Sequence, residues 1–139
     1  MNKMKTTEFR NITIALLLIC SLFATTVRAQ KDITGDEILS SLKKGDAKSL
    51  GTWFNSSLDL EMPGNEGTYS KAQAEVIIDR FFRDNPSEGA EYIHSGSSDN
   101  GSKYYIGIYK CEDIQFRFYL LLKKVSGKML IHQVQFEED

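Results

Sequence analysis

The change of hydrophobic period along the chain constrains its fold more than any other feature of the sequence. From Glu91 onward apolar and polar residues alternate with a period of two, which is typical of half-buried β-strands. Asn100-Gly101 suits a type I′ hairpin turn, and Ser126-Gly127 suits a second tight turn. The alternating runs cover residues 91–97, 103–111, 114–125 and 129–136. This pattern predicts four consecutive antiparallel strands.

Two short helices are predicted ahead of the strands. Thr34 and Glu37 have the spacing of a capping box, in which each residue satisfies a backbone amide of the other. Gly45 is well placed to end this first helix, because glycine adopts the left-handed conformation at low cost. Asp46 is expected to cap a second helix, whose apolar residues over 47–54 recur at helical spacing.

A short strand and a third helix complete the predicted pattern. Residues 57–62 alternate as a strand, and residues 64–67 are interpreted as a plain connection. Ser70 and Gln73 form a second capping box at the start of a helix that ends before Pro86. The sequence therefore predicts an α+β domain in the order helix, helix, strand, helix and four-strand meander. The N-terminal helices are expected to pack on a curved antiparallel sheet.

The N-terminus has the pattern of a secretory signal peptide. Lys3, Lys5 and Arg10 precede an apolar run at residues 12–27, and cleavage after Ala29 fits the small-residue rule. The run is shorter than the roughly 20 residues of a bilayer-spanning helix, and no second apolar stretch follows it. We therefore expect export to the periplasm or the outside and no membrane association afterwards. The predicted organisation is a signal peptide at 1–29 and a single domain at 30–139.

Charge and cysteine content narrow the set of partners. The chain has a net charge of −2, and removal of the signal peptide makes it more negative, so nucleic acid is not an expected partner. Cys20 could carry a lipid, but bulky Ile19 precedes it where lipidation signals have a small residue. Loss of Cys20 with the signal peptide would leave Cys111 unpaired. It is interpreted as a buried thiol or, alternatively, as a disulfide link between two copies.

The two faces of the predicted sheet differ in their expected roles. One face carries Phe116, Phe118, Leu120 and Leu122 of the longest run and is expected to meet the helices. On the last strand, Leu130, His132, Val134 and Phe136 are expected on this same face. The opposite face is too apolar for a simple solvent face, which predicts a partner surface and a homodimer. Its interface candidates are Arg117, Tyr119, Leu121, Met129, Ile131 and Gln133.

Several short segments, in this order, resemble the nuclear-transport-factor-like (cystatin-like, cone-shaped α+β) superfamily. The segments are LKKGDAKSLGTWF, LDLEMPGNEGTYSKAQA, IIDRFF and FRFYLLLKKVSGKMLIHQVQF. More narrowly, they resemble a small secreted bacterial domain of unknown function within it. The resemblance implies a cone that the paired N-terminal helices close, with a pocket for an apolar small molecule. The candidate pocket residues are Trp53, Phe54, Tyr69, Phe81, Tyr104, Phe118 and His132.

The superfamily includes enzymes such as ketosteroid isomerase and scytalone dehydratase, so fold alone does not assign a function. The isomerase resemblance puts its general-base aspartate directly before the proline that ends the first strand, where this chain has Met62. Glu61 would point to the opposite face. Neither histidine stands at a metal-ligand spacing, so we expect no metal and no cofactor. We therefore expect a non-catalytic binding domain; the alternative is an isomerase-like, dehydratase-like or hydrolase-like enzyme that uses His132.

Overall fold

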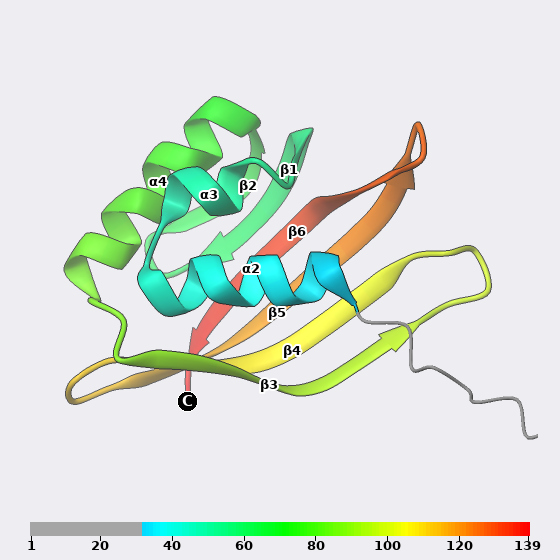
Figure 1. Cartoon of the computed structure of the whole chain (residues 1–139). Helices are drawn as coiled ribbons and strands as arrows, with labels where there is room; N and C mark the ends of the chain where they lie inside the picture. Colours follow the sequence, from blue (N-terminus) through cyan, green and yellow to red (C-terminus); the bar gives the residue numbers. More distant parts are fainter. Residues whose placement is uncertain (1–31) are drawn as a thin grey trace, which may run out of the picture. The chain divides into compact units, whose positions relative to one another are not determined.

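The computed structural model describes residues 32–139, which form one compact unit. The predicted signal peptide and Cys20 lie outside the described residues. The order of the elements confirms the predicted α+β class, in which helices from the first half of the chain pack on a curved sheet (Figure 1). The elements are α2 (Ile33–Lys44), α3 (Ala47–Gly51), β1 (Phe54–Met62), β2 (Asn65–Ser70), α4 (Lys71–Asp84), β3 (Gly89–Ser97), β4 (Lys103–Lys110), β5 (Gln115–Val125) and β6 (Lys128–Glu138).

The six strands form one sheet in the order β2-β1-β6-β5-β4-β3. Strands β3 to β6 pair antiparallel with their chain neighbours, as predicted for a meander. Strand β1 pairs in parallel with β6, so the sheet is mixed rather than purely antiparallel. The predicted connection at 64–67 is wrong, because Asn65 begins β2, which pairs with β1 at the sheet edge. Most side chains of β2 are exposed, so no apolar alternation marks this strand in the sequence.

The first two helices begin and end at residues that satisfy their free backbone groups. Asp32, not Thr34, caps α2 by accepting the Gly35 amide at 3.3 Å. Gly45 ends the helix as predicted, in the left-handed conformation with φ 61°. Asp46 caps α3 as predicted, accepting the Ser49 amide at 3.0 Å.

Helix α3 is shorter than its apolar spacing predicted. It ends at Gly51, and Phe54 already begins β1. The Trp53 carbonyl accepts a hydrogen bond from the Ile131 amide of β6 at 2.7 Å. The backbone of Trp53 therefore pairs with the sheet and does not continue the helix. A cross-strand hydrogen bond to a residue far along the chain thus overrides the local helical pattern.

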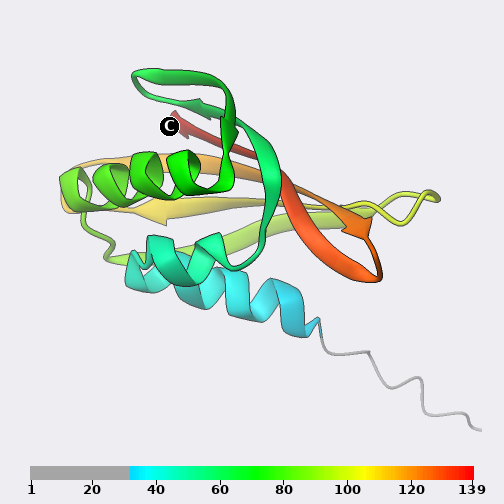
Figure 2. The same ribbon diagram turned by 90° about the horizontal axis from the view of Figure 1, so that it is seen from above.

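Helix α4 follows its sequence pattern closely. The Ser70 and Gln73 capping box is complete, and the helix buries Ala74, Ile78, Phe81 and Phe82. The β1–β2 hairpin curls over this helix on one side (Figure 2). Helix α4 therefore fills the concave side of the most curved part of the sheet.

A bulge in β6 changes which residues face the core. Leu121 pairs with Gln133 and Leu122 pairs with Ile131, which leaves His132 as an extra residue without an opposite partner. Because the bulge shifts the alternation by one residue, Ile131 is fully buried and His132 is half-buried. The predictions for this part of the strand are corrected: Ile131 and Met129 belong to the core side, not to the outer face. Leu130 and His132 do not hold inner positions.

Aromatic side chains fill the space between the sheet and α4. The Phe81 ring lies 4.8 Å from that of Phe136 and 5.0 Å from that of Phe116, measured between ring centroids. Phe82 stacks on Tyr109 at 5.5 Å. The inside of the curved sheet is thus packed with the protein's own rings. Within residues 32–139, no helix combines the length and apolar character needed to cross a bilayer.

Candidate functional site

The seven residues predicted to line one cone pocket do not converge. Phe54, Phe81 and Phe118 are core residues with at most 8% of their surface exposed. Tyr104 lies on the opposite face of β4 from Tyr105, which is buried against the helices. Of the remaining candidates, Tyr69 is half-buried on edge strand β2, Trp53 lines a surface groove beside α2 and His132 lies in the β6 bulge.

His132 is half-buried in the β6 bulge, and its ring contacts the backbone of its own strand. Its Nδ1 lies 3.0 Å from the Leu130 carbonyl oxygen, a contact within its own strand. Such a bond orients the ring by a neighbouring backbone group. In the described part of the chain, no group of three or more His, Cys, Asp or Glu side chains is arranged to hold a metal ion.

The outer face of the sheet, which we define as the face of β4, β5 and β6 turned away from the helices, carries three cross-strand rows. Each row continues from β4 through β5 to β6, so its side chains lie next to one another. Most of these side chains are half-buried although no element of residues 32–139 packs over them. The rows are Tyr104–Leu121–Gln133, Ile106–Tyr119–Gln135 and Ile108–Arg117–Glu137.

Two tyrosine rings and a histidine contact one another near the middle of this face. Tyr104 and Tyr119 are stacked, with ring centroids 6.3 Å apart and planes 22° from parallel. The Tyr104 hydroxyl lies 2.8 Å from His94 Nε2 on β3. A hollow of about 210 Å³ opens beside Ile106 and Arg117. Half-exposed aromatic and aliphatic side chains with an arginine at the margin are typical of protein interfaces.

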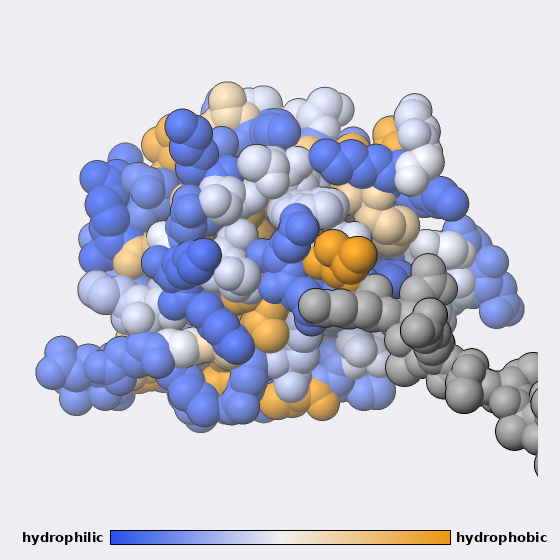
Figure 3. All heavy atoms as spheres, viewed as in Figure 1, coloured by the Kyte–Doolittle hydropathy of each residue, from blue (hydrophilic) through white to orange (hydrophobic). Residues whose placement is uncertain are grey.

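The helix side of the domain has a different character. Seen from this side, the surface is predominantly hydrophilic, and its hydrophobic residues form separate small spots (Figure 3). Scattered apolar residues are normal on a soluble surface, whereas contiguous rows are not. The candidate functional site is therefore the outer face. Four of the six predicted interface residues, Arg117, Tyr119, Leu121 and Gln133, lie on this face. The other two do not, because Ile131 is buried and Met129 packs against the core.

Charge is distributed unevenly along β5 and β6. Three exposed lysines, Lys123, Lys124 and Lys128, surround the turn that joins the two strands. The opposite end is acidic, because it carries the β4–β5 turn and the chain end. Arg117 pairs there with Asp139 at 2.7 Å. The exposed acids of this end are Glu112, Asp113, Glu137, Glu138 and Asp139.

A polar junction that the sequence did not suggest holds α2 on the sheet. Tyr105 donates its hydroxyl proton to Asp32, and Lys103 Nζ lies 3.3 Å from the same carboxylate. Burial alone would raise the pKa of Asp32, but hydrogen bonds from Tyr105 and Gly35 and the charge of Lys103 outweigh it and lower the pKa below its ordinary value. Tyr92 adds a hydrogen bond to the Gly35 carbonyl at 2.8 Å.

Cys111 is half-buried rather than buried. Its Sγ lies 3.7 Å from the Asn85 carbonyl oxygen. Burial, with a smaller contribution from Glu88, raises the pKa of the thiol. A raised pKa lowers the thiolate fraction at neutral pH and so slows oxidation to a disulfide.

These observations define a class: a curved, open six-stranded sheet whose concave side holds the helices is the NTF2-like fold. A family model described as a domain of unknown function, DUF4783, matches residues 35–137. The chain belongs to the DUF4783 family. Both findings confirm the resemblance drawn from the sequence.

Solved structures agree with this assignment. The chain is similar to a DUF4783 family protein from Bacteroides ovatus, with 26% identity, a TM-score of 0.70 and coverage of 74% of this chain and 93% of the other. A relative from Bacteroides uniformis has 24% identity, a TM-score of 0.71 and coverage of 75% and 95%. An NTF2-like protein of unknown function from Shewanella baltica shares the fold at 16% identity, with a TM-score of 0.58 and coverage of 75% and 86%. The comparison with curated proteins gave no match.

Proposed function

We propose that this protein is a non-catalytic assembly domain whose outer face packs against the same face of a second copy. The observation that carries the proposal is the set of three contiguous rows on β4, β5 and β6, with Tyr104, Ile106, Tyr119 and Leu121 at their centre. A surface of this kind loses unfavourable contact with water when it is covered. Two identical copies supply the same apolar surface to each other across a two-fold axis.

The packed interior supports this role over an apolar ligand in the cone. Phe118, Leu120 and Leu122 are fully buried beneath the helices, and Phe81 and Phe136 fill the space beside them. Close-packed protein interiors contain few voids larger than a water molecule. An apolar ligand would have to displace several core rings at a cost of several kcal/mol.

The charge distribution favours one relative orientation of the two copies. A two-fold axis that lies in the interface, perpendicular to the strands, makes the facing sheets run in opposite directions. The lysine-rich β5–β6 turn of one copy then faces the acidic end of the other, where Glu137 and Glu138 lie. An axis parallel to the strands would bring like charges together, which is unfavourable. We therefore propose the antiparallel arrangement.

The test is the mass of the protein in solution as a function of its concentration, measured by sedimentation. We expect a dimer for the wild type and a monomer with an unchanged circular dichroism spectrum for Leu121→Glu. The matched control is Val76→Glu on α4, because Val76 is 58% exposed on the helix side and its replacement should leave the dimer intact. A wild type that stays monomeric at the highest soluble concentration would refute the proposal.

A charge exchange tests the orientation separately. Lys123 and Glu137 lie on the outer face at opposite ends of it. We expect Lys123→Glu and Glu137→Lys each to weaken the dimer, and the double variant to recover part of the loss at low salt. If the double variant is weaker than either single variant, the antiparallel arrangement is wrong.

We also propose that the domain works outside the cytoplasm after cleavage at Ala29. The support is the order of basic residues, apolar run and small residues in the sequence of the N-terminus. Intact mass measurement on protein recovered from an exported fraction should give the mass of residues 30–139. A full-length mass in the soluble cell extract would contradict export.

A further inference from the structure

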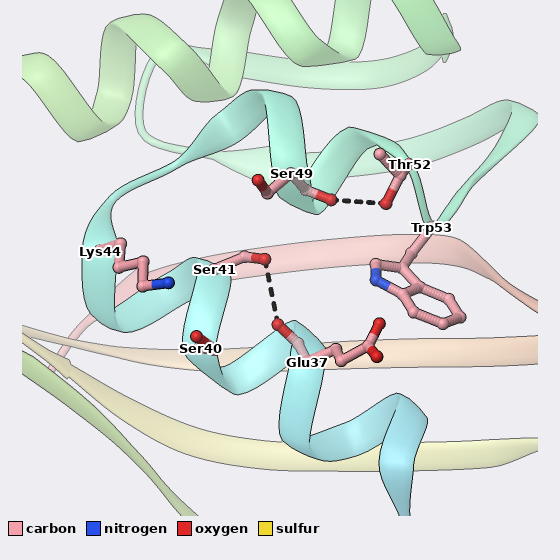
Figure 4. A pocket seen from close by; sticks show the side chains of 7 residues that line it. All are labelled: Glu37, Ser40, Ser41, Lys44, Ser49, Thr52 and Trp53. Carbon is pink, nitrogen blue, oxygen red and sulfur yellow. Dashed lines mark hydrogen bonds between the residues drawn. The ribbon is translucent and has the colours of Figure 1, made fainter.

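A polar groove of about 270 Å³ lies between α2 and the segment from α3 to β1 (Figure 4). It belongs to the helix side of the domain, so assembly through the outer face leaves it open. The volume is just below the range of about 300–1,000 Å³ that is usual for small-molecule sites, which limits the ligand to roughly one ring. Its lining residues are Glu37, Ser40, Ser41, Lys44, Ser49, Thr52 and Trp53.

The hydroxyl groups of the groove face it mainly as acceptors. Ser49 donates its hydroxyl proton to Asp46 at 2.6 Å, and Thr52 donates its own to the Ser49 carbonyl at 2.7 Å. Ser41 similarly donates to the Glu37 carbonyl at 3.0 Å. A hydroxyl that has donated its proton retains lone pairs for a ligand. The groove therefore suits a ligand with several donor groups.

The charged residues of the groove balance each other. Glu37 and Lys44 lie two helical turns apart on α2, both exposed, and in Figure 4 the Glu37 carboxylate points toward Trp53. One carboxylate and one ammonium give no net attraction for an anion or a cation. They supply acceptors at one end and donors at the other, which favours a neutral ligand with both kinds of group.

Trp53 supplies the apolar surface of the groove. Its indole is half-buried, and Figure 4 shows the ring nitrogen directed into the groove. Lys128 Nζ lies 5.3 Å from the ring centroid, a cation–π contact that already neutralises part of the attraction of the ring for a cationic ligand. A large aromatic surface with a polar N–H suits a ligand that has a C–H face and a polar edge.

We propose that this groove binds a neutral polyhydroxylated ring, such as a hexose unit. The C–H face of the ring packs on Trp53, while ring hydroxyls donate to Glu37, Ser49 and Thr52. Lys44 donates in return to hydroxyl oxygens. A ring of this kind combines an apolar C–H face with several donors and acceptors at zero net charge. An anion would meet the Glu37 carboxylate in the lining, and a quaternary ammonium would lack hydrogen-bond donors for the hydroxyl oxygens.

The test uses the single tryptophan of the chain, whose indole N–H gives one isolated NMR signal. The ¹⁵N-labelled protein is titrated with D-glucose, D-galactose and N-acetyl-D-glucosamine over the millimolar range. We expect a saturable shift of the Trp53 signal with at least one sugar. Tetramethylammonium and inorganic phosphate serve as charged probes and should leave the signal unchanged.

Two variants remove groove groups without changing the packed core. Thr52→Val and Glu37→Gln should each weaken sugar binding at least fivefold. Thr68→Val and Glu66→Gln on β2 are the matched controls, since both side chains are exposed away from the groove, and should bind like the wild type. Absence of a saturable shift with every sugar, or a shift with tetramethylammonium alone, would overturn the proposal. Because this test does not depend on oligomeric state, it can fail or succeed independently of the proposed dimer.

Discussion

Replacement of Gly107 by alanine probes the closest packing in the sheet. Gly107 lies in the middle of β4, opposite Tyr92 of β3 and Phe118 of β5. An added Cβ would lie 2.3 Å from the Glu91 carbonyl oxygen and 2.3 Å from Phe118 Cζ. Such atoms normally stay more than 3 Å apart, and one of the two contacts is with backbone, which cannot rotate out of the way.

The expected cost follows from the movement that these contacts require. Both neighbours must shift by roughly 1 Å, the Phe118 ring within a fully buried core and Glu91 together with its strand. Overpacking of a close-packed interior costs about 1–3 kcal/mol, and two simultaneous clashes place Gly107→Ala at the upper end. At about 4–8 °C per kcal/mol for a domain near 100 residues, the melting temperature should fall by roughly 10–20 °C.

Thermal unfolding followed by circular dichroism measures this change. The matched control is Gly51→Ala, since the Cβ there would meet the end of the flexible Glu75 side chain, at 2.8 Å from Oε2. Alanine also has a higher helix propensity than glycine, and Gly51 is the last residue of α3, so this variant should be about as stable as the wild type. Equal melting temperatures for Gly107→Ala and the wild type would refute the argument that the close approach is required.

Two further predictions concern single polar groups. Asp32→Asn should cost about 1 kcal/mol at neutral pH, because asparagine keeps the cap but loses the negative charge that faces Lys103, Tyr105 and the N-terminus of α2. The pKa of Asp32 is lowered in the folded state, so the stabilisation by its charge is present above the ordinary pKa of 3.8 and is lost as the pH falls below it. The difference in unfolding free energy between variant and wild type, measured in urea, should therefore shrink below this pH. A difference that does not change with pH would exclude this charge effect. Cys111→Ser should have the same sedimentation mass as the wild type. A wild-type mass that halves in reductant, or a monomeric Cys111→Ser variant, would assign the dimer to a disulfide.

The candidate site was partly predictable from the sequence. The alternation of β5 identified Arg117, Tyr119 and Leu121 on one face, because the period of two in a regular strand leaves no other arrangement. The same reasoning failed on β6, because the bulge at His132 exchanges the inner and outer positions of the residues that precede it in the strand. A bulge is set by the pairing with β5, and no local residue pattern marks it here.

The groove beside Trp53 was not predictable in this form. Trp53 was expected in a helix and inside a cone, whereas its carbonyl pairs with Ile131 and its ring lies at the surface. The hydroxyl-bearing residues that line the groove come from both α2 and the following turn. Their convergence depends on how α2 and α3 pack together, which is a matter of tertiary contacts.

By itself the sequence determined the α+β class, helix α4 with its capping box, the two N-terminal helices and the four-strand meander. These features depend on contacts between residues near in the chain, where periodicity, caps and turn residues act directly. Only the tertiary structure decided the parallel pairing of β1 with β6, edge strand β2, the β6 bulge and the filled interior. Each of these depends on contacts between distant residues, whose energies reside in backbone pairing and side-chain packing and leave little trace in local sequence.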